Sequence, residues 1–221
     1  MKTLLWHLGL GDAIICAPIA VALAKEHGAL TVPCWRRNLT SVKIIFIEDP
    51  EIEVFPIDSE AELPYASPDA IRLGQYNPKE YRLPGENFDA WFFRQAGMDI
   101  IKDQMFCPIR KMFDTPKYRE IINAHSTEAP FRFIHEDPSR EFVIDRSGFA
   151  PDLDHVLPRD KKFSILENAI MISLAKEVHC IDSSFLHLAE KVPTSGKLFY
   201  HKYARPNSEN ITLQKPWIIL T

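Results

Sequence analysis

A glycine-rich turn carrying one carboxylate stands near the start of the chain. Gly9-Leu10-Gly11-Asp12 follows the apolar run 3–8 and precedes an alanine-rich stretch that Gly28 closes. Glycines let the backbone turn tightly and approach a ligand, and a helix start offers free N–H groups. Gly9 and Gly11 are therefore predicted to allow the approach of a phosphate, and Asp12 is a candidate general base for a substrate hydroxyl. An ordinary helix N-cap explains Asp12 equally well.

A second polar cluster follows an apolar strand in the other half of the sequence. Asp182, Ser183 and Ser184 come directly after the strand predicted over 178–181, and His187 follows on the helix that they open. Open α/β sheets bind ligands where strands end, and a helix start suits phosphate. The cluster predicts a phosphate site. The alternative is that Asp182 or a serine only caps the helix and that His187 is a core histidine whose ring nitrogens are hydrogen-bonded within the protein.

Other residues that could contribute have weaker support. Lys161 precedes an amphipathic segment over 163–176 and would add positive charge to a phosphate site, although a solvated loop also explains it. Arg36 and Arg37 follow the second predicted strand and suit the 2′-phosphate of NADPH, but Ile14 stands where a dinucleotide fingerprint needs its third glycine. The cysteines form no CxxC pair, so we predict no metal site.

These residues need a parallel sheet to position them. Apolar strands are expected near 3–8, 29–35, 52–57, 70–73, 131–134, 178–181 and 197–200, with helices over 13–27, 88–98, 116–125 and 184–191 between them. Strand–helix–strand spacing calls for parallel strands with right-handed crossovers. A linker over 126–130 divides the chain into domains 1–125 and 126–221. We expect an α/β protein of two Rossmann-like halves that face each other across a cleft.

Composition excludes several classes of protein. Hydrophobic residues make up 46% of the 221 and charged residues 25%, with a net charge of −4 and no basic cluster, which disfavours a nucleic-acid partner. No run of about twenty apolar residues predicts a membrane span. His7, Gly9, Gly11 and Asp12 interrupt what would be a signal-peptide core. We therefore expect a cytoplasmic protein, and peripheral contact with a membrane stays open.

The two polar turns together resemble a known family. The opening Leu8-Gly9-Leu10-Gly11-Asp12-Ala13 with Pro18 early in the helix is similar to the first motif of the heptosyltransferases, which are GT-B glycosyltransferases. The segment Asp182-Ser183-Ser184 with His187-Leu188-Ala189 resembles their Asp-x-Gly-x-x-His-x-Ala motif, in the expected order. Ser184 replaces the usual glycine, and His135-Glu136-Asp137 replaces the Pro-Gly phosphate turn. The chain is also shorter than most GT-B enzymes.

The resemblance implies inverting, metal-independent transfer of a sugar from a nucleotide-sugar to a hydroxyl of a saccharide or glycolipid acceptor, without a cofactor. Asp12 would match the base that deprotonates the acceptor. Asp182, Ser183, Ser184 and His187 would match the donor diphosphate and ribose region, with Lys161 beside them. Two alternatives remain at this point: an inactive nucleotide- or sugar-binding protein of the same fold, and an NADPH-dependent oxidoreductase.

Overall fold

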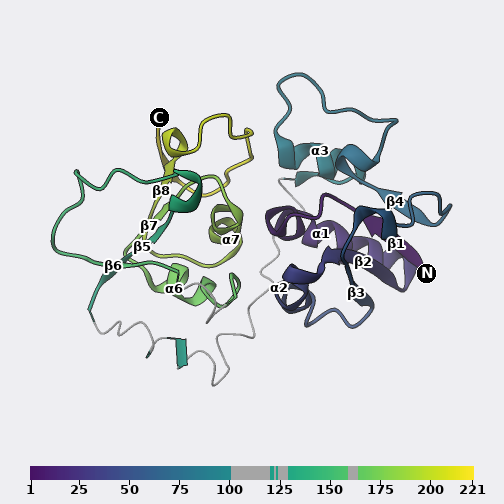
Figure 1. Cartoon of the computed structure of the whole chain (residues 1–221), viewed down its shortest axis with the longest axis horizontal. Coiled ribbons are helices and arrows are strands. Elements are labelled where there is room, and N and C mark those ends of the chain that lie inside the picture. Colours follow the sequence, from purple (N-terminus) through teal and green to yellow (C-terminus); the bar gives the residue numbers. More distant parts are fainter. Residues whose placement is uncertain (101–119, 122, 124–128, 159–163) are drawn as a thin grey trace. The chain divides into compact units, whose positions relative to one another are not determined.

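The computed structural model divides the chain into two compact units (Figure 1). Unit 1 comprises Met1–Pro108 with Glu209–Thr212, and unit 2 comprises Ile109–Ser208 with Leu213–Thr221. The structure describes residues 1–100, 120–121, 123, 129–158 and 164–221. Most of the predicted helix over 116–125 and of the linker over 126–130 lies outside these residues, so the domain boundary at 125 stays a prediction.

Unit 1 is built on a four-stranded parallel sheet. Its strands are β1 (Lys2–Leu5), β2 (Leu30–Trp35), β3 (Ile52–Ile57) and β4 (Ala70–Arg72), in the order β3-β2-β1-β4. The helices are α1 (Leu10–His27), α2 (Leu39–Ile45) and α3 (Phe88–Gln95), and α1 contacts both of the others. The buried residues of β1 and β2 form near-continuous apolar runs, as strands covered on both faces require.

The main helix of unit 1 begins earlier than its sequence suggests. Gly9 is the N-cap residue, and Asp12 lies inside the first turn, so the N-cap interpretation of Asp12 is wrong. Gly28 ends the helix in the left-handed conformation, with φ 79°, and donates its N–H to the Ala24 carbonyl, as predicted. Pro18 is tolerated within this buried helix.

Unit 2 contains a five-stranded parallel sheet. Its strands are β5 (Phe131–His135), β6 (Asp154–Val156), β7 (Glu177–Cys180), β8 (Lys197–His201) and β9 (Trp217–Leu220), in the order β6-β5-β7-β8-β9. Helices α6 (Ala169–Leu174) and α7 (Ser184–Lys191) lie within its described residues. The sequence pattern does not predict β6, and the helix predicted over 163–176 is shorter, because a hydrogen-bonded turn over 164–168 precedes it. The C-terminal apolar tail, expected to pack, pairs with β8 as β9.

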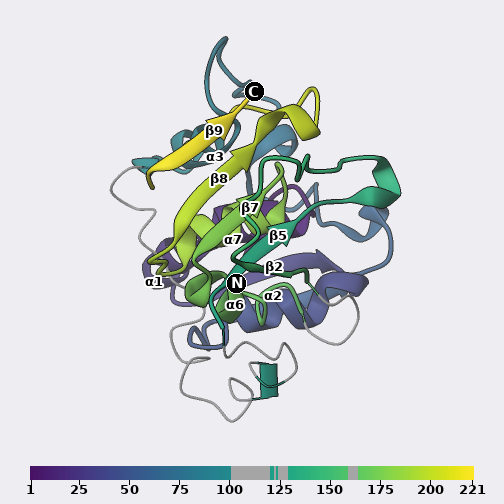
Figure 2. The ribbon, with the colours of Figure 1, turned by 90° about the vertical axis from the view of Figure 1, so that its left-hand side faces the viewer.

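The handedness of the crossovers decides which face of this sheet is covered. The connection from β5 to β6 moves toward one edge of the sheet, whereas the connections from β6 to β7, β8 and β9 move toward the other edge. Because crossovers are right-handed, the first connection covers one face of the sheet and the later connections cover the opposite face. Helices α6 and α7 lie on one face, where Phe185 contacts Phe133 and stacks on His135. The other face receives loop 136–153, which contains no α-helix (Figures 1 and 2).

The face that receives loop 136–153 is polar at its centre. Arg132 and Glu177 form a buried ion pair at 2.6 Å. His179 Nδ1 lies 2.8 Å from His201 Nε2, and His201 Nδ1 lies 3.0 Å from the Tyr203 hydroxyl. These residues line a groove of about 860 Å³ over the sheet. Burial lowers the pKa of both histidines to about 4, so they are neutral at pH 7.

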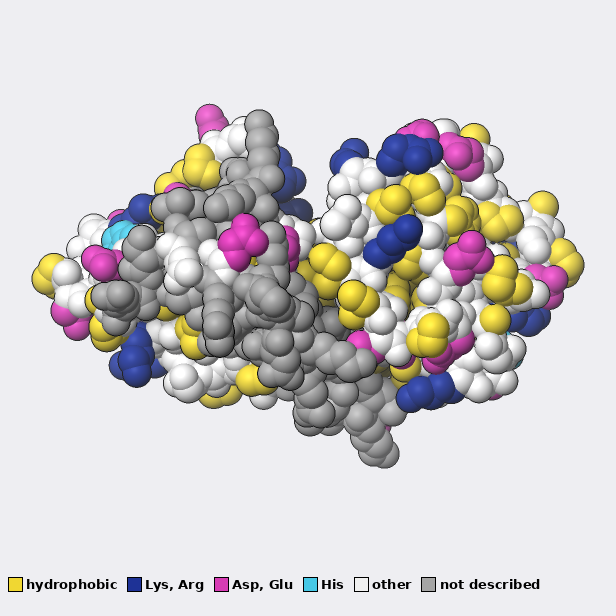
Figure 3. Space-filling model, turned by 90° about the horizontal axis from the view of Figure 1, so that it is seen from below, with side chains coloured by type: hydrophobic (Ala, Val, Ile, Leu, Met, Phe, Trp, Pro, Cys, Tyr) yellow, Lys and Arg dark blue, Asp and Glu magenta, His cyan; other side chains and the backbone are white. Residues whose placement is uncertain are grey.

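Several expectations from composition meet the structure here. Within the described residues, no helix is long and apolar enough to cross a membrane. Cys16, Cys34 and Cys180 are buried thiols, and Cys107 lies outside the described part. On the face of unit 1 that Figure 3 shows, basic and acidic side chains are interspersed rather than gathered by sign.

Candidate functional sites

Each sheet has one point where the strand order reverses. In unit 1 it lies between β1 and β4, and in unit 2 between β5 and β7. Connections leave these neighbouring strands on opposite faces, so a crevice opens beyond their carboxyl ends, which is where open α/β sheets bind ligands. The two polar turns identified from the sequence follow β1 and β7, so the topology places each of them at such a point.

At the first reversal, Gly9 makes room for Asp12. A Cβ added to Gly9 would overlap Oδ2 of Asp12, so the carboxylate folds back over the glycine. Asp12 is partly exposed and lies in the first turn of α1, where a carboxylate stabilises the helix through its dipole. Its charge also reaches Tyr76, whose pKa is raised mainly by burial and in part by that charge. Gly11 lies in the same turn.

His7 joins the two strands at this reversal. It follows β1, and its Nε2 accepts a hydrogen bond of 2.9 Å from the backbone N–H of Gln75, which follows β4. Gly74 has φ +62°, and a Cβ there would overlap His7 and Phe92. Four aromatic rings surround the imidazole at 5.1–6.0 Å between centroids: Tyr76, Phe88, Trp91 and Phe92. Burial lowers the pKa of His7 to about 4.

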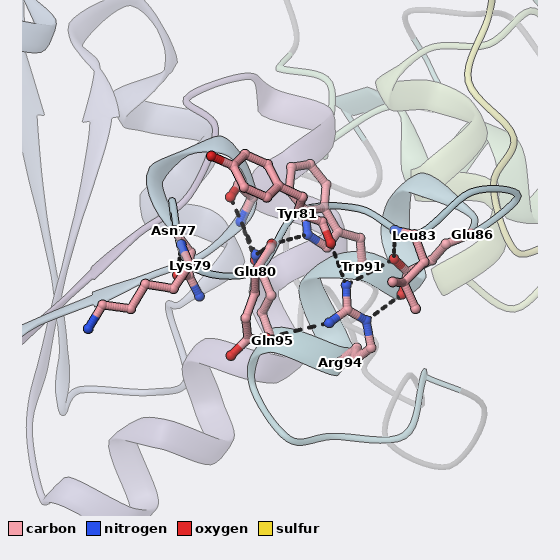
Figure 4. A network of polar contacts seen from close by, with 10 residues as sticks. Asn77, Lys79, Glu80, Tyr81, Leu83, Glu86, Trp91, Arg94 and Gln95 are labelled. Atoms are coloured by element: carbon pink, nitrogen blue, oxygen red, sulfur yellow. Dashed lines mark hydrogen bonds and ion pairs between the residues drawn. The ribbon is translucent and has the colours of Figure 1, made fainter.

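A polar network fixes the loop that holds these rings (Figure 4). Arg94 of α3 donates from Nε to Glu86 Oε1 at 2.7 Å and from Nη2 to the Tyr81 carbonyl at 3.0 Å. Trp91 Nε1 and Gln95 Nε2 both donate to the Glu80 carbonyl, at 3.0 and 2.6 Å. The network fastens loop 77–86 to α3, so Trp91 keeps its place beside His7.

At the second reversal, Ser183 connects the two central strands of unit 2. It is the N-cap residue of α7, but its side chain makes no capping bond. Its hydroxyl instead lies 3.1 Å from Nδ1 of His135, at the end of β5. The first N–H groups of a helix have no partner within the helix, and a missing side-chain cap leaves them for a ligand.

Arg205 and His187 lie near the start of α7. Arg205 Nη1 donates to the Asp182 carbonyl at 2.6 Å and lies 3.9 Å from Asp182 Oδ2. His187 is partly exposed, and neither of its ring nitrogens is hydrogen-bonded within the described part of the chain. Its pKa is lowered to about 4 by burial and then by the charges of Lys191 and Arg205. His187 is therefore not the satisfied core histidine that we had weighed as the alternative.

The structure also bears on the remaining candidates. Arg36 makes a two-pronged ion pair with Asp58, with 2.8 Å from Nε to Oδ1 and 2.7 Å from Nη2 to Oδ2, and Arg37 lies over the ring of Trp35. Both arginines thus have partners where NADPH would need them. Lys161 lies outside the described residues, so its role stays a prediction.

Sequence reasoning missed His135 and Arg205 and assigned His7 no chemistry. The only signal for His135 is a histidine directly after a predicted strand, and His7 lies within the strand predicted near 3–8; neither position distinguishes a functional histidine. Arg205 follows β8 and is distant from Asp182 in the sequence. The two residues are in contact only because β7 and β8 pair in parallel, so the sequence pattern does not predict this contact.

With this geometry in view, the chain can be compared with known proteins. No protein-family model matches the sequence, and no curated protein matches it. Among solved structures, it is similar to ADP-heptose heptosyltransferase II of Escherichia coli, with a TM-score of 0.63 and 13% identity over 100% of this chain and 90% of that one.

Two further structures show the same similarity. A family 9 glycosyl transferase from Veillonella parvula has a TM-score of 0.57 and 12% identity, over 99% of this chain and 86% of that one. The iron-containing dodecameric glycosyltransferase TibC of enterotoxigenic E. coli has a TM-score of 0.56 and 15% identity, over 90% of this chain and 57% of that one. The chain has a heptosyltransferase-like fold. The predicted α/β class with two Rossmann-like parallel sheets is confirmed.

Proposed function

We propose that this protein is a glycosyltransferase that moves a sugar from a nucleotide-sugar bound by unit 2 to a hydroxyl of an acceptor bound by unit 1. The main support is the pair of strand-order reversals, one beside the carboxylate of Asp12 and the other beside the guanidinium of Arg205 and the uncapped start of α7. The fold shared with glycosyltransferases supports the same reaction class. A cytoplasmic location remains part of this proposal.

In unit 2, the donor diphosphate would lie at the start of α7. The amides of Ser184 and Phe185 would donate to its oxygens, and Arg205 would balance part of its charge. His187, whose pKa is lowered mainly by burial and then by the charges of Lys191 and Arg205, would gain a proton when a dianion arrives. These positive groups would stabilise the departing nucleoside diphosphate without a metal.

In unit 1, Asp12 would be the general base. The acceptor hydroxyl would give its proton to the carboxylate as its oxygen attacks the anomeric carbon, and the bond from that carbon to the diphosphate would break with its electron pair leaving on the nucleotide. Attack opposite the leaving group inverts the anomeric carbon. Gly9 would contribute by leaving space for Asp12.

Binding and turnover test the proposal separately. A thermal-shift screen of UDP-, GDP- and ADP-sugars against NADPH should show stabilisation by one nucleotide-sugar, since a ligand that binds the native state raises its melting temperature. Arg205→Gln should weaken that binding by roughly tenfold, because it removes a charge-assisted contact. Arg37→Gln, a matched change in unit 1, should leave it unaltered.

Asp12→Asn then distinguishes an enzyme from an inactive binding protein. We expect nucleotide binding to persist while turnover, measured as nucleoside diphosphate release with EDTA present, falls by at least roughly 100-fold. Stabilisation by NADPH alone would refute the transferase proposal. Binding by the wild-type protein without any sugar transfer, across acceptor extracts, would favour the inactive binding protein.

A further inference from the structure

The groove over the second sheet contains a chain of hydrogen bonds whose direction is fixed. A carboxylate can only accept, so His179 donates from Nε2 to Glu177 Oε2, at 3.4 Å. Burial lowers the pKa of His179 to about 4, so its ring is neutral and Nδ1 carries a lone pair. That nitrogen accepts from His201 Nε2 at 2.8 Å, and His201 Nδ1 accepts from the Tyr203 hydroxyl at 3.0 Å. The Tyr203 oxygen accepts in turn from the backbone N–H of Asp145 at 2.9 Å. Every imidazole nitrogen of the chain is therefore occupied.

Two polar atoms at the end of this chain stay open. Arg132 donates from Nε to Glu177 Oε2, and its Nη1 contacts the Ala150 carbonyl and His155. Among the described residues, Nη2 of Arg132 and Oε1 of Glu177 have no hydrogen-bond partner. The Arg132 side chain is only 2% exposed, yet Nη2 is not among the fully buried polar atoms without a partner, so it is reached from the groove that Arg132 lines. One ion pair thus presents one open donor and one open acceptor.

This ion pair lies on the face of the sheet opposite to α7. Phe133 and His135 of β5 contact Phe185 of α7. Successive side chains of a strand point to opposite faces, so Arg132 points away from α7, and Glu177 is its partner in the register of β5 and β7. The groove is therefore separate from the phosphate site that we propose at the start of α7.

The charges and rings of the groove indicate the kind of ligand. Arg132 and Glu177 neutralise each other, so the carboxylate would repel an anion and the guanidinium would repel a cation. Phe149 lies 4.5 Å from the Arg132 guanidinium, and Phe199 stacks on His179 with 4.4 Å between centroids and 3° between planes. Both phenylalanines are partly exposed and line the groove. Such rings favour a flat, uncharged partner, and a few polar groups among them fix its orientation.

We infer that this groove binds a flat, neutral heterocycle with a lactam edge, which is an N–H directly beside a carbonyl, as in uracil and guanine. The carbonyl accepts from Arg132 Nη2, and the N–H donates to Glu177 Oε1. The groove of about 860 Å³ has room for such a ring and its substituents. The site goes beyond the proposed function, because neither the donor nor the acceptor of the sugar transfer lies on this face.

Uracil and 1,3-dimethyluracil test these hydrogen bonds on the unaltered full chain. Both are flat, neutral rings with the same carbonyls, but methylation removes each N–H. We expect uracil to bind at least roughly tenfold more tightly, because only uracil can donate to Glu177. Phenol, a flat ring with a single hydroxyl, should bind more weakly than uracil. In ¹H–¹⁵N NMR titrations, uracil should shift amides of β7, β8 and 145–150 rather than those at the start of α7.

Glu177→Gln replaces the open acceptor with an amide that can donate. We expect uracil binding to fall to the level of 1,3-dimethyluracil, measured at a temperature where circular dichroism shows the variant to be folded. Glu141→Gln, the same change at an exposed position of loop 136–153 outside the groove, should bind uracil as the wild type does. Equal binding of uracil and 1,3-dimethyluracil by the wild type, phenol binding as tight as that of uracil, undiminished binding by Glu177→Gln, uracil shifts confined to the start of α7, or no uracil binding would each overturn the inference.

Discussion

Glu177→Gln removes the charge that neutralises a buried guanidinium in unit 2. The side chain of Arg132 is 2% exposed, and its Nε donates to Glu177 Oε2 at 2.6 Å. The remaining contacts of Arg132 are weaker: Nη1 lies 3.3 Å from the Ala150 carbonyl and 3.1 Å from His155 Nε2, and the guanidinium lies 4.5 Å from the ring centre of Phe149. None of them supplies a negative charge.

The size of the effect follows from these contacts. Removing one partner of a buried ion pair costs about 3–5 kcal/mol, because the other charge stays buried and unpaired. The Glu177 side chain is 21% exposed, so water compensates part of that cost. We therefore expect Glu177→Gln to lower the free energy of unfolding by about 2–3 kcal/mol. Arg132→Met leaves the more exposed partner, and its cost should be about 1–2 kcal/mol.

The double variant decides between charge and packing. With both charges gone, Arg132→Met with Glu177→Gln should cost little more than Arg132→Met alone, a coupling of about 2 kcal/mol. Urea unfolding gives each value, and amide exchange in β5 and β7 shows that the loss is in unit 2. Asp58→Asn, which breaks the solvent-exposed pair with Arg36, is the matched control and should not shift the midpoint. Additive costs in the double variant would refute the reasoning.

Two other changes test the packing and the buried histidines. Gly196→Ala should lower the free energy of unfolding by about 2 kcal/mol or more, because the added Cβ would overlap the Ala175 carbonyl and lie 2.6 Å from the Lys176 carbonyl. Gly148→Ala is the control and should be neutral, since no atom lies within 4 Å of its added Cβ. Equal urea midpoints for the two variants would contradict this prediction. The free energy of unfolding should fall as the pH drops from about 6.5 toward 4. In this range the histidines are protonated in the unfolded chain but stay neutral in the native protein, so each fully buried ring lowers the free energy of unfolding by up to ~1.4 kcal/mol per pH unit. A urea midpoint unchanged between pH 7 and 5 would contradict the lowered pKa values of His7, His135, His179, His187 and His201.

Much of the fold could be predicted because local signals and long-range packing agree. The strand over 52–57 has the predicted bounds, and Gly28 ends α1 as expected, since left-handed backbone there favours glycine. The predictions failed where local patterns are weak. β6 has only three residues, and two of them are exposed, so no apolar pattern marks it. The apolar spacing over 163–176 fits a longer helix than α6, but a polar turn occupies the first part of that segment.

The candidate sites divide in the same way. Asp12 and the segment 182–187 were found because a turn with polar residues after an apolar strand is visible along the chain. His135 and Arg205 were not found, since each acquires its role through a partner distant in sequence, Ser183 in one case and Asp182 in the other. Their contacts exist only because parallel pairing brings the ends of β5, β7 and β8 to one edge.

By itself, the sequence determined the α/β class, the parallel strands and the two turns that open α1 and α7, because periodicity, glycines and helix starts are local properties. Only the tertiary structure decided the strand order. That order placed the reversals beside Asp12 and Ser183 and gave one face of the second sheet to loop 136–153. It also fixed the tautomer of His7, because the N–H that holds its ring comes from Gln75, which is distant in sequence but follows the neighbouring strand.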